Sequence, residues 1–211
     1  MLMFDMEIVF HTYVESLMGA VESARSEIQQ YAAELERSVA ELSELSRRDP
    51  LTSLLNHRAF IEELKREIAR AEREGRALSL AYIDLNGFKE VNDARGHQAG
   101  DRILRAVARL LVENTRASDI ACRYGGDEFA VILPQCTTAQ ARQVCEKVMA
   151  EIQSHSLDGV SLSIGIAESA PGFRLNMDDL ITAADTAMYR AKDLSRRTPG
   201  SHLLLAPPPA L

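Results

Sequence analysis

Two glycines and two acidic residues follow one another at Gly125, Gly126, Asp127 and Glu128. Adjacent glycines permit positive φ at both central positions of a tight turn and let a ligand approach the backbone closely. The neighbouring carboxylates repel each other unless a cation or a hydrogen-bond donor lies beside them. Taken alone, these residues fit a hairpin with two solvated acids as well as they fit one side of a binding site.

A further carboxylate, Asp84, is the first charged residue after a run that is typical of a largely buried strand over residues 78–84. A carboxylate at the end of a strand, beside a turn that carries Asp127, suits Mg²⁺, which takes oxygen ligands and keeps several waters. Taken alone, Asp84 fits the capping residue of a following helix better than a metal ligand.

Asn92, His97 and Asp101 form a third polar group. Asn and Asp side chains can read the edge of guanine, because a carboxylate accepts from N1–H and N2–H₂ and an amide offers both a donor and an acceptor. Each residue also has a structural interpretation. Asp101 fits the cap of the helix that follows it, and His97 fits a loop histidine with a structural hydrogen bond.

Two basic residues near the end of the chain, Lys192 and Arg196, lie four positions apart within a run that predicts a helix. That spacing places them on one helical face. They are therefore either a surface charge pair or a clamp for phosphate groups.

The elements that must position these residues alternate between helical and strand periodicity. The Gly-Gly turn joins two of the strands in a hairpin, which is antiparallel, so the predicted fold class is α/β with a mixed sheet. The predicted helices cover residues 57–74, 101–113, 138–153 and 178–194, the third capped by Thr137 or Thr138. The predicted strands cover residues 78–84, 120–124, 128–133 and 160–167, with an edge strand at 203–205.

Residues 10–46 contain no proline, and apolar residues recur through them at heptad spacing. This pattern predicts a helix with a coiled-coil seam, the alternative being an amphipathic helix packed on its own domain. Because Pro50 disfavours helix at the residue before it, we expect a helix over 1–48, a domain over 49–205 and a disordered tail over 206–211. The two heptad series are Val14, Val21, Ile28, Leu35 and Leu42, and Phe10, Leu17, Ala24, Tyr31, Ser38 and Leu45.

The composition limits the classes of protein that the chain can represent. The net charge of −7 argues against nucleic acid as the main partner, and residues 1–48 hold nine acidic and four basic residues, net −5. No run reaches the roughly 18 apolar residues of a membrane span, and the start lacks the features of a signal peptide. Three cysteines without a CxxC pair favour reduced thiols and a cytoplasmic location.

Over roughly residues 49–205 these segments together resemble the GGDEF family of diguanylate cyclases. Each motif alone is weak, but their order and spacing are specific to the family. The matching stretches are Asp49-Pro50-Leu51-Thr52 with Leu54 and Asn56, Asp84-Leu85-Asn86-Gly87-Phe88-Lys89 with Asn92-Asp93, Gly96-His97 and Gly100-Asp101, Arg123-Tyr124-Gly125-Gly126-Asp127-Glu128-Phe129, Ser163-Ile164-Gly165, and Ala184-Asp185 with Ala187-Met188-Tyr189 and Ala191-Lys192. The departures are Ser53 and Ser195 in place of glycines, His57 in place of an arginine and Asn86 in place of a second aspartate.

The resemblance implies a cyclase/polymerase-palm-like fold and the condensation of two GTP molecules into cyclic di-GMP and two pyrophosphates. Asp84 and Asp127 match the family's Mg²⁺ ligands, with the Leu85 carbonyl as a further ligand and Mn²⁺ as a substitute ion. Asp127 or Glu128 is expected where the 3′-hydroxyl proton is removed. Because one domain holds one GTP, the reaction needs a homodimer, which a coiled coil of the N-terminal helix would supply.

The resemblance also implies contacts to the substrate. Asn92 and Asp101 match the guanine readers, and His97 lies in the same loop. Lys89, Lys192 and Arg196 match the family's phosphate contacts, and Lys89 is also expected among the catalytic residues. Gly125 and Gly126 match the turn that binds substrate.

Arg116 and Asp119 form an Arg-x-x-Asp sequence, and five residues lie between Asp119 and Gly125. In the family such a sequence at this place resembles a site where cyclic di-GMP binds and inhibits, whereas the structural alternative is an ion pair between residues i and i+3. Two other functions remain as alternatives. One is a non-catalytic receptor for GTP or cyclic di-GMP on the same fold, and the other is a dimerisation module.

Overall fold

The structure is a computed structural model that describes residues 10–11, 13–15, 17–19, 21–32, 47–155, 157–171 and 176–207. The chain divides into two compact units between Ser46 and Arg47. In the first unit every described residue is helical, and the apolar side chains at the heptad positions Val21, Ile28 and Tyr31 are each more than 60% exposed. Pairing of this helix in a coiled coil stays a prediction, and the predicted helix over 33–46 lies outside the described residues.

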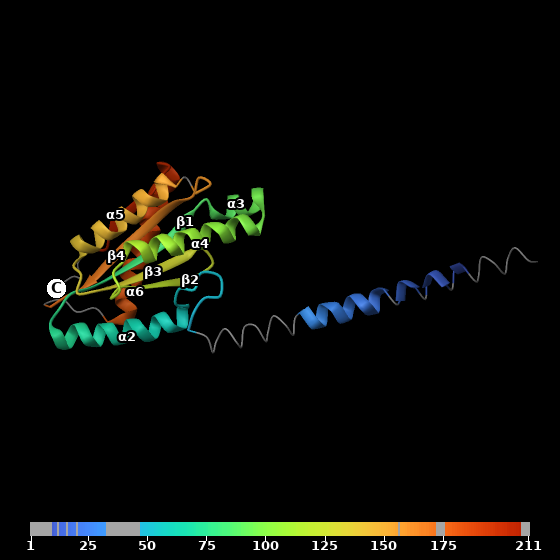
Figure 1. Ribbon diagram of the computed structural model, residues 1–211, viewed down its shortest axis with the longest axis horizontal. Coiled ribbons are helices and arrows are strands. Elements are labelled where there is room, and N and C mark those ends of the chain that lie inside the picture. The colour runs from blue at the N-terminus through green and yellow to red at the C-terminus, as the bar shows by residue number, and fades with distance from the viewer. Residues whose placement is uncertain are drawn as a thin grey trace, which may run out of the picture. The chain divides into compact units, whose positions relative to one another are not determined.

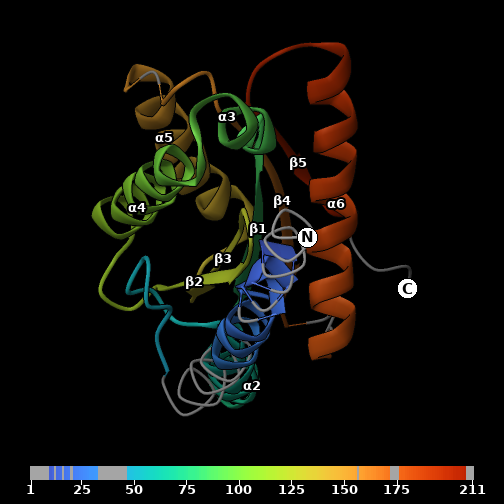
Figure 2. The same cartoon turned by 90° about the vertical axis from the view of Figure 1, so that its right-hand side faces the viewer.

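In the second unit, helices cover both faces of a five-stranded sheet with the order β2-β3-β1-β4-β5 (Figures 1 and 2). Neighbouring strands are antiparallel except β4 and β5, which are parallel. This arrangement confirms the predicted α/β fold with a mixed sheet. The strands are β1 (Leu78–Asn86), β2 (Ile120–Gly125), β3 (Glu128–Pro134), β4 (Ser161–Ser169) and β5 (His202–Leu205).

The helices of this unit begin and end where their caps dictate. The first begins after Asn56, whose side chain accepts a hydrogen bond from the backbone N–H of Ala59, and ends at Gly75 in the left-handed region. The helix α5 (Thr138–Ser154) is capped by Thr137, one of the two residues that the sequence offers as its cap, and Thr137 forms a capping box with Gln140. The helices are α2 (His57–Glu74), α3 (Phe88–Arg95), α4 (His97–Asn114), α5 (Thr138–Ser154) and α6 (Met177–Arg197).

The sheet is buried on both faces, with α4 and α5 on one side and α2 and α6 on the other. Along β1, Ala81 and Ile83 belong to the core beneath α4 and α5, whereas Leu80 and Tyr82 belong to the core beneath α2 and α6. A strand buried on both faces reads as a continuous apolar run, which explains residues 78–84. Because side chains alternate along a strand, Asp84 projects to the side of Leu80 and Tyr82, toward α6.

The structure corrects the prediction of a helix over residues 101–113. That helix, α4, begins four residues earlier at His97, and a separate helix, α3, precedes it. Gly96, with a φ of 78°, ends α3 and starts α4, and α3 buries only Val91, so its apolar periodicity is too weak to predict a helix. The capping alternatives are wrong as well, because Asp101 lies inside α4 and Gly87 is the N-cap of α3 in place of Asp84.

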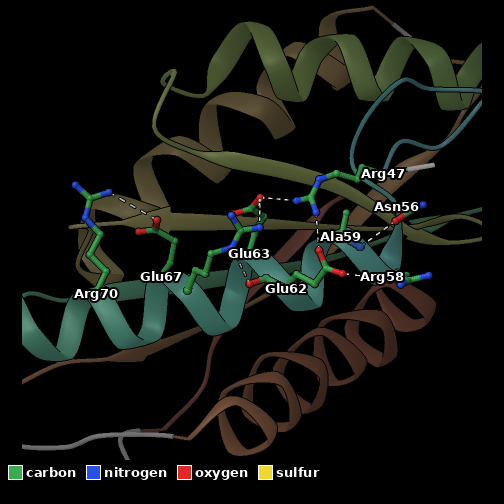
Figure 3. A network of polar contacts seen from close by, with 9 residues as sticks. Arg47, Asn56, Arg58, Ala59, Glu62, Glu63, Glu67 and Arg70 are labelled. Atoms are coloured by element: carbon green, nitrogen blue, oxygen red, sulfur yellow. Dashed lines mark hydrogen bonds and ion pairs between the residues drawn. The ribbon is translucent and has the colours of Figure 1, made fainter. Parts of the chain in front are cut away.

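Arg47, the first residue of the second unit, lies beside α2 (Figure 3). The guanidinium of Arg47 donates to Glu62 at 2.5 Å and to Glu63 at 2.7 Å, and Glu63 also pairs with Arg66. Exposed ion pairs of this kind each contribute about 0–1 kcal/mol, so the network adds little to the stability of the fold. Among the described residues, no helix has the length and apolar character that a bilayer span requires.

Candidate active site

Asp84 lies on the central strand of the sheet, directly across from Glu128 on β3 and from Ser163 on β4. Its side chain is almost fully buried, with 3% of the residue exposed. The ammonium group of Lys192 on α6 donates to one carboxylate oxygen, Oδ2, at 2.7 Å. The other oxygen, Oδ1, is buried and has no hydrogen-bond partner among the residues that the structure describes. The sheet and α6 therefore hold a buried carboxylate of which one oxygen is paired and the other can still bind a ligand.

Electrostatics around this group favour an added cation. Burial raises the pKa of Asp84 above its usual range, although Lys192 opposes that rise, and the charge of Asp127 adds to it. Burial likewise raises the pKa of Glu128, with further contributions from Asp84, Asp127 and Asp185. Lys192 and Arg196 therefore offset the burial of Asp84 only in part, and the raised pKa values of Asp84 and Glu128 reflect the free-energy cost of keeping negative charge at the site.

The donor set at this site fits Mg²⁺. Among the described residues, no three His, Cys, Asp or Glu side chains converge as a self-sufficient metal site. Mg²⁺ does not need such a cage, because it is commonly held by one or two carboxylates together with waters and substrate phosphates. The unpartnered oxygen of Asp84 and the carboxylate of Asp127 suit that mode. The backbone N–H of Leu85 also donates to the Asp127 carbonyl at 3.3 Å, which ties the turn to β1.

The Gly-Gly turn is held from outside the hairpin. Gly126 has a φ of 46°, and the guanidinium of Arg123 donates to its carbonyl at 2.8 and 3.0 Å. The same guanidinium pairs with Asp49 at 3.1 Å, in the loop before α2. Both residues belong to the matching motifs, but they are 74 positions apart in the sequence, and their spacing does not predict that they meet. Asp49 thereby acts through Arg123 on the carbonyl that immediately precedes Asp127.

An aromatic cluster packs beside this turn and was also absent from the predictions. The centroid of the Tyr124 ring lies 4.2 Å from that of His57, 4.8 Å from that of Tyr82 and 5.6 Å from that of Phe60. All three contacts have edge-to-face geometry. Burial raises the pKa of Tyr82 far above its usual range, so its hydroxyl stays neutral. The cluster joins the start of α2 to the hairpin.

A cleft of 310 Å³ opens beside the turn. It brings together Asp127 from the hairpin, Lys89 from α3, and both Lys192 and Arg196 from α6. Arg196 is mostly exposed and pairs with Asp193 at 3.0 Å, so its guanidinium can exchange this contact for a ligand at little cost. The lining thus holds three cations and two carboxylates, Asp127 and Glu90, a combination suited to the phosphates of a metal-bound nucleotide.

The predicted base readers lie apart from the lining of this cleft. Asn92 is half buried on α3, whereas His97 is exposed at the first position of α4 and Asp101 is half buried one turn later. The carboxamide oxygen of Asn92 is buried without a partner. The structure thus places Asn92 and Asp101 on two helices that pack together, and the cleft itself gathers only the groups suited to metal and phosphate.

Arg116 and Asp119 lie in the turn between α4 and β2. The Asp119 carboxylate accepts a hydrogen bond from the backbone N–H of Arg116 at 2.8 Å, and no ion pair joins their side chains in the part of the chain that the structure describes. The structural alternative to a product-binding site, an ion pair between residues i and i+3, is therefore not what the structure has here. Both residues line a second cavity, of 460 Å³, together with Arg48 and the exposed side chain of Val112. The Arg116 guanidinium is exposed beside this cavity and can meet a ligand.

Comparison with known proteins gives consistent matches. The sequence model of the family described as "Diguanylate cyclase, GGDEF domain" matches residues 46–198. The diguanylate cyclase DosC of Escherichia coli K12 is 38% identical over 153 residues, which are 70% of this chain and 33% of DosC. The response regulator PleD of Caulobacter vibrioides is 36% identical over 161 residues, which are 72% of this chain and 35% of PleD. The chain therefore spans about a third of the length of these curated relatives.

Solved structures share the fold. The coiled coil and GGDEF domain of DgcB from Caulobacter crescentus, in complex with c-di-GMP, superposes with a TM-score of 0.68 at 32% identity and covers 87% of this chain and 100% of that one. The GGDEF domain of PA1120 from Pseudomonas aeruginosa gives a TM-score of 0.66 at 37% identity and covers 76% of this chain and 94% of that one.

Proposed function

The chain belongs to the GGDEF family of diguanylate cyclases, and from this premise we propose that it condenses two GTP molecules into cyclic di-GMP with release of two pyrophosphates. One observation carries the proposal. Asp84 is buried opposite Glu128, keeps one carboxylate oxygen without a partner, and lies beside Asp127 and Lys192. A buried acid in this state destabilises the fold unless a cation completes it, which supports a functional metal site.

The reaction is a nucleotidyl transfer that occurs twice. The 3′-oxygen of one GTP bonds to the α-phosphorus of the other, the bond from that phosphorus to the bridging oxygen breaks, and pyrophosphate leaves. The hydroxyl proton passes to a carboxylate, Asp127 or Glu128. Mg²⁺ held by Asp84, Asp127 and the Leu85 carbonyl would lower the pKa of the hydroxyl and neutralise charge that develops on the phosphate.

The remaining side chains bind and orient the substrate. Lys89, Lys192 and Arg196 surround the cleft and hold the phosphates, and the glycines of the turn let the nucleotide approach the backbone. Asn92 and Asp101 read guanine, with His97 beside them. Each domain holds one GTP, and much of the rate enhancement comes from positioning the two reactants. Two copies of the domain must therefore face each other.

Incubation of the chain with GTP and Mg²⁺ tests the proposal directly. The expected products are cyclic di-GMP and pyrophosphate in a ratio of one to two, identified by mass spectrometry and a coupled pyrophosphate assay. ATP in place of GTP should give no cyclic dinucleotide. Binding of GTP or cyclic di-GMP without turnover would instead support the receptor, and a dimer that binds neither would support the dimerisation module.

Removal of residues 1–46 should lower turnover per domain at least about tenfold at low protein concentration, with recovery as concentration rises. The physical reason is that the helix raises the effective concentration of one catalytic domain near another. Initial rates measured over a dilution series, beside sedimentation analysis, check this. Ile28→Glu, which puts a charge in the exposed seam, should act like the deletion, whereas Glu22→Gln on another face should not. Equal turnover of the shortened chain at every dilution would contradict the role of the helix.

Arg116→Ala should weaken inhibition by cyclic di-GMP: the concentration of product needed for half-maximal inhibition should rise about tenfold or more. The initial rate should change little. The turn uses backbone atoms of residue 116, its N–H toward the Asp119 carboxylate and its carbonyl toward the Asp119 N–H. Alanine keeps both, so the change removes the guanidinium without disturbing the local fold. Inhibition curves with added product measure the effect. Arg109→Ala on α4 removes a comparable exposed guanidinium and serves as control. Unaltered inhibition of the Arg116 variant would refute the product site.

A further inference from the structure

Gly100 occupies an unfavourable place for a glycine. It is buried within α4, one turn from the start of the helix. Glycine in a helix is less stable than alanine, because it loses more backbone entropy on folding. Its φ does not lie in the left-handed region, so the backbone conformation does not require glycine here. Some other feature must favour the absence of a side chain at this position.

The space that a side chain would occupy is already filled by Asn92. A Cβ atom at position 100 would lie 2.1 Å from the Asn92 carboxamide oxygen, 3.0 Å from its Cγ, and 2.9 Å from the tip of the Phe88 ring. These neighbours are the outer ends of side chains, and no backbone atom is among them. An alanine could therefore be accommodated, but only if the Asn92 carboxamide left its present position.

The carboxamide of Asn92 is oriented by this packing. Its oxygen, Oδ1, is buried against Gly100 and has no hydrogen-bond partner. Within the described part of the chain no donor or acceptor pairs with the buried end. Placing the oxygen there costs less than burying the amino group, which would leave two N–H donors unpaired. With the oxygen turned inward, the amide nitrogen is the end that remains to donate to a ligand.

We propose that Gly100 is a positioning residue for base selection: it leaves room for the Asn92 oxygen and so fixes that carboxamide as a hydrogen-bond donor toward the purine. The inference rests on the proposed function, because it takes Asn92 as a contact to the base. A carboxamide that cannot rotate offers only its donor. One that is released can turn and offer its oxygen to the exocyclic amine of adenine, which guanine replaces with an acceptor.

The test compares the full chain with Gly100→Ala, Asn92→Ala and the double variant. Dissociation constants for non-hydrolysable GTP and ATP analogues are measured with Mg²⁺ present, together with KM and kcat for GTP and the melting temperature. Gly100→Ala should weaken binding of the GTP analogue about tenfold and narrow the preference for it over the ATP analogue. The loss should fall on KM more than on kcat.

The double variant separates positioning from general damage. In the Asn92→Ala background, the Gly100→Ala substitution should cost no further affinity. It should also raise the melting temperature, because the carboxamide is gone, only the tip of the Phe88 ring has to shift, and alanine favours the helix. Gly19→Ala is the matched control. It makes the same change in a helix where a Cβ atom would meet nothing within 4 Å, so it should leave the affinities unchanged.

Three results would overturn the inference: wild-type affinity and base preference in Gly100→Ala, losses that add in the double variant, or a large fall in melting temperature for Gly100→Ala. The last would mean that more than two side-chain ends must move. If the wild type binds the GTP analogue but forms no cyclic di-GMP, the proposed function fails while the affinities still decide the role of Gly100.

Discussion

Asp127→Asn is expected to lower the rate of cyclic di-GMP synthesis about 10³-fold or more. The change keeps the size of the side chain but removes a carboxylate that we propose binds Mg²⁺ and that is a candidate base. Acid–base groups and metal ligands each contribute effects of this order. Initial rates with saturating GTP over a range of Mg²⁺ concentrations measure the loss. The rise in melting temperature that Mg²⁺ with a GTP analogue gives the wild type should also disappear.

The Asp127→Asn substitution should lower activity but should not lower the thermal stability of the metal-free protein. The charge of Asp127 contributes to the raised pKa of both Asp84 and Glu128. A carboxyl group whose pKa is raised by folding destabilises the folded state at pH values above that pKa, and the penalty vanishes as the pH falls through it. Neutralising Asp127 lowers both pKa values, so the metal-free variant should melt at the same or a higher temperature than the wild type near pH 7.

Glu146→Gln is the control for this experiment, since it neutralises an exposed carboxylate on α5 that pairs only with Arg142 among the described residues. It should change neither rate nor Mg²⁺ response. The assignment of Asp127 would be wrong if its variant kept more than about a tenth of the wild-type rate. A metal-free melting temperature many degrees lower would instead show that activity was lost by unfolding.

Gly165→Ala is expected to lower the free energy of unfolding by about 3 kcal/mol or more, which is enough to leave much of the protein unfolded. Gly165 lies on β4 where α6 packs directly on the strand. A Cβ atom there would lie 2.1 Å from the carbonyl oxygen of Ala184 and 2.2 Å from the amide nitrogen of Met188. Both are backbone atoms of α6, so the whole helix would have to shift.

Urea unfolding followed by circular dichroism measures the effect on the expressed protein, and soluble yield measures it if the variant does not fold. Because α6 carries Lys192, any protein that folds should also have lost the 2.7 Å contact with Asp84. Gly100→Ala provides the contrast, since its neighbours are side-chain ends and its fold should survive. A Gly165→Ala protein with wild-type unfolding free energy would show that α6 does not pack on β4 as described.

The strands and helices followed from local rules where those rules were strong. The helix from His57 to Glu74 was predicted to the residue, because Asn56 and Gly75 are effective caps around a clear apolar face. Helix α3 was not predicted, because its eight residues bury one side chain. Because β1 is buried on both faces, its residues do not alternate between apolar and polar. The sequence therefore does not indicate that Asp84 lies on the side of α6.

The site divides in the same way. The sequence by itself determined the family motifs, the hairpin, and the residue types suited to metal, phosphate and base. It did not show that Arg123 joins Asp49 to the turn. Nor did it show that Asp119 accepts from the backbone of Arg116, whose guanidinium has no ion pair with the residues that the structure describes.

Only the tertiary structure decided which groups meet. Lys192 reaches Asp84 across 108 positions of sequence because the register of β1 and the packing of α6 on Gly165 place them together. Gly100 and Gly165 look alike in the sequence, yet one makes room for a side chain and the other for a helix backbone. Residue type and spacing determine local conformation and candidate chemistry, whereas strand register and helix packing arise from long-range contacts that no local pattern encodes.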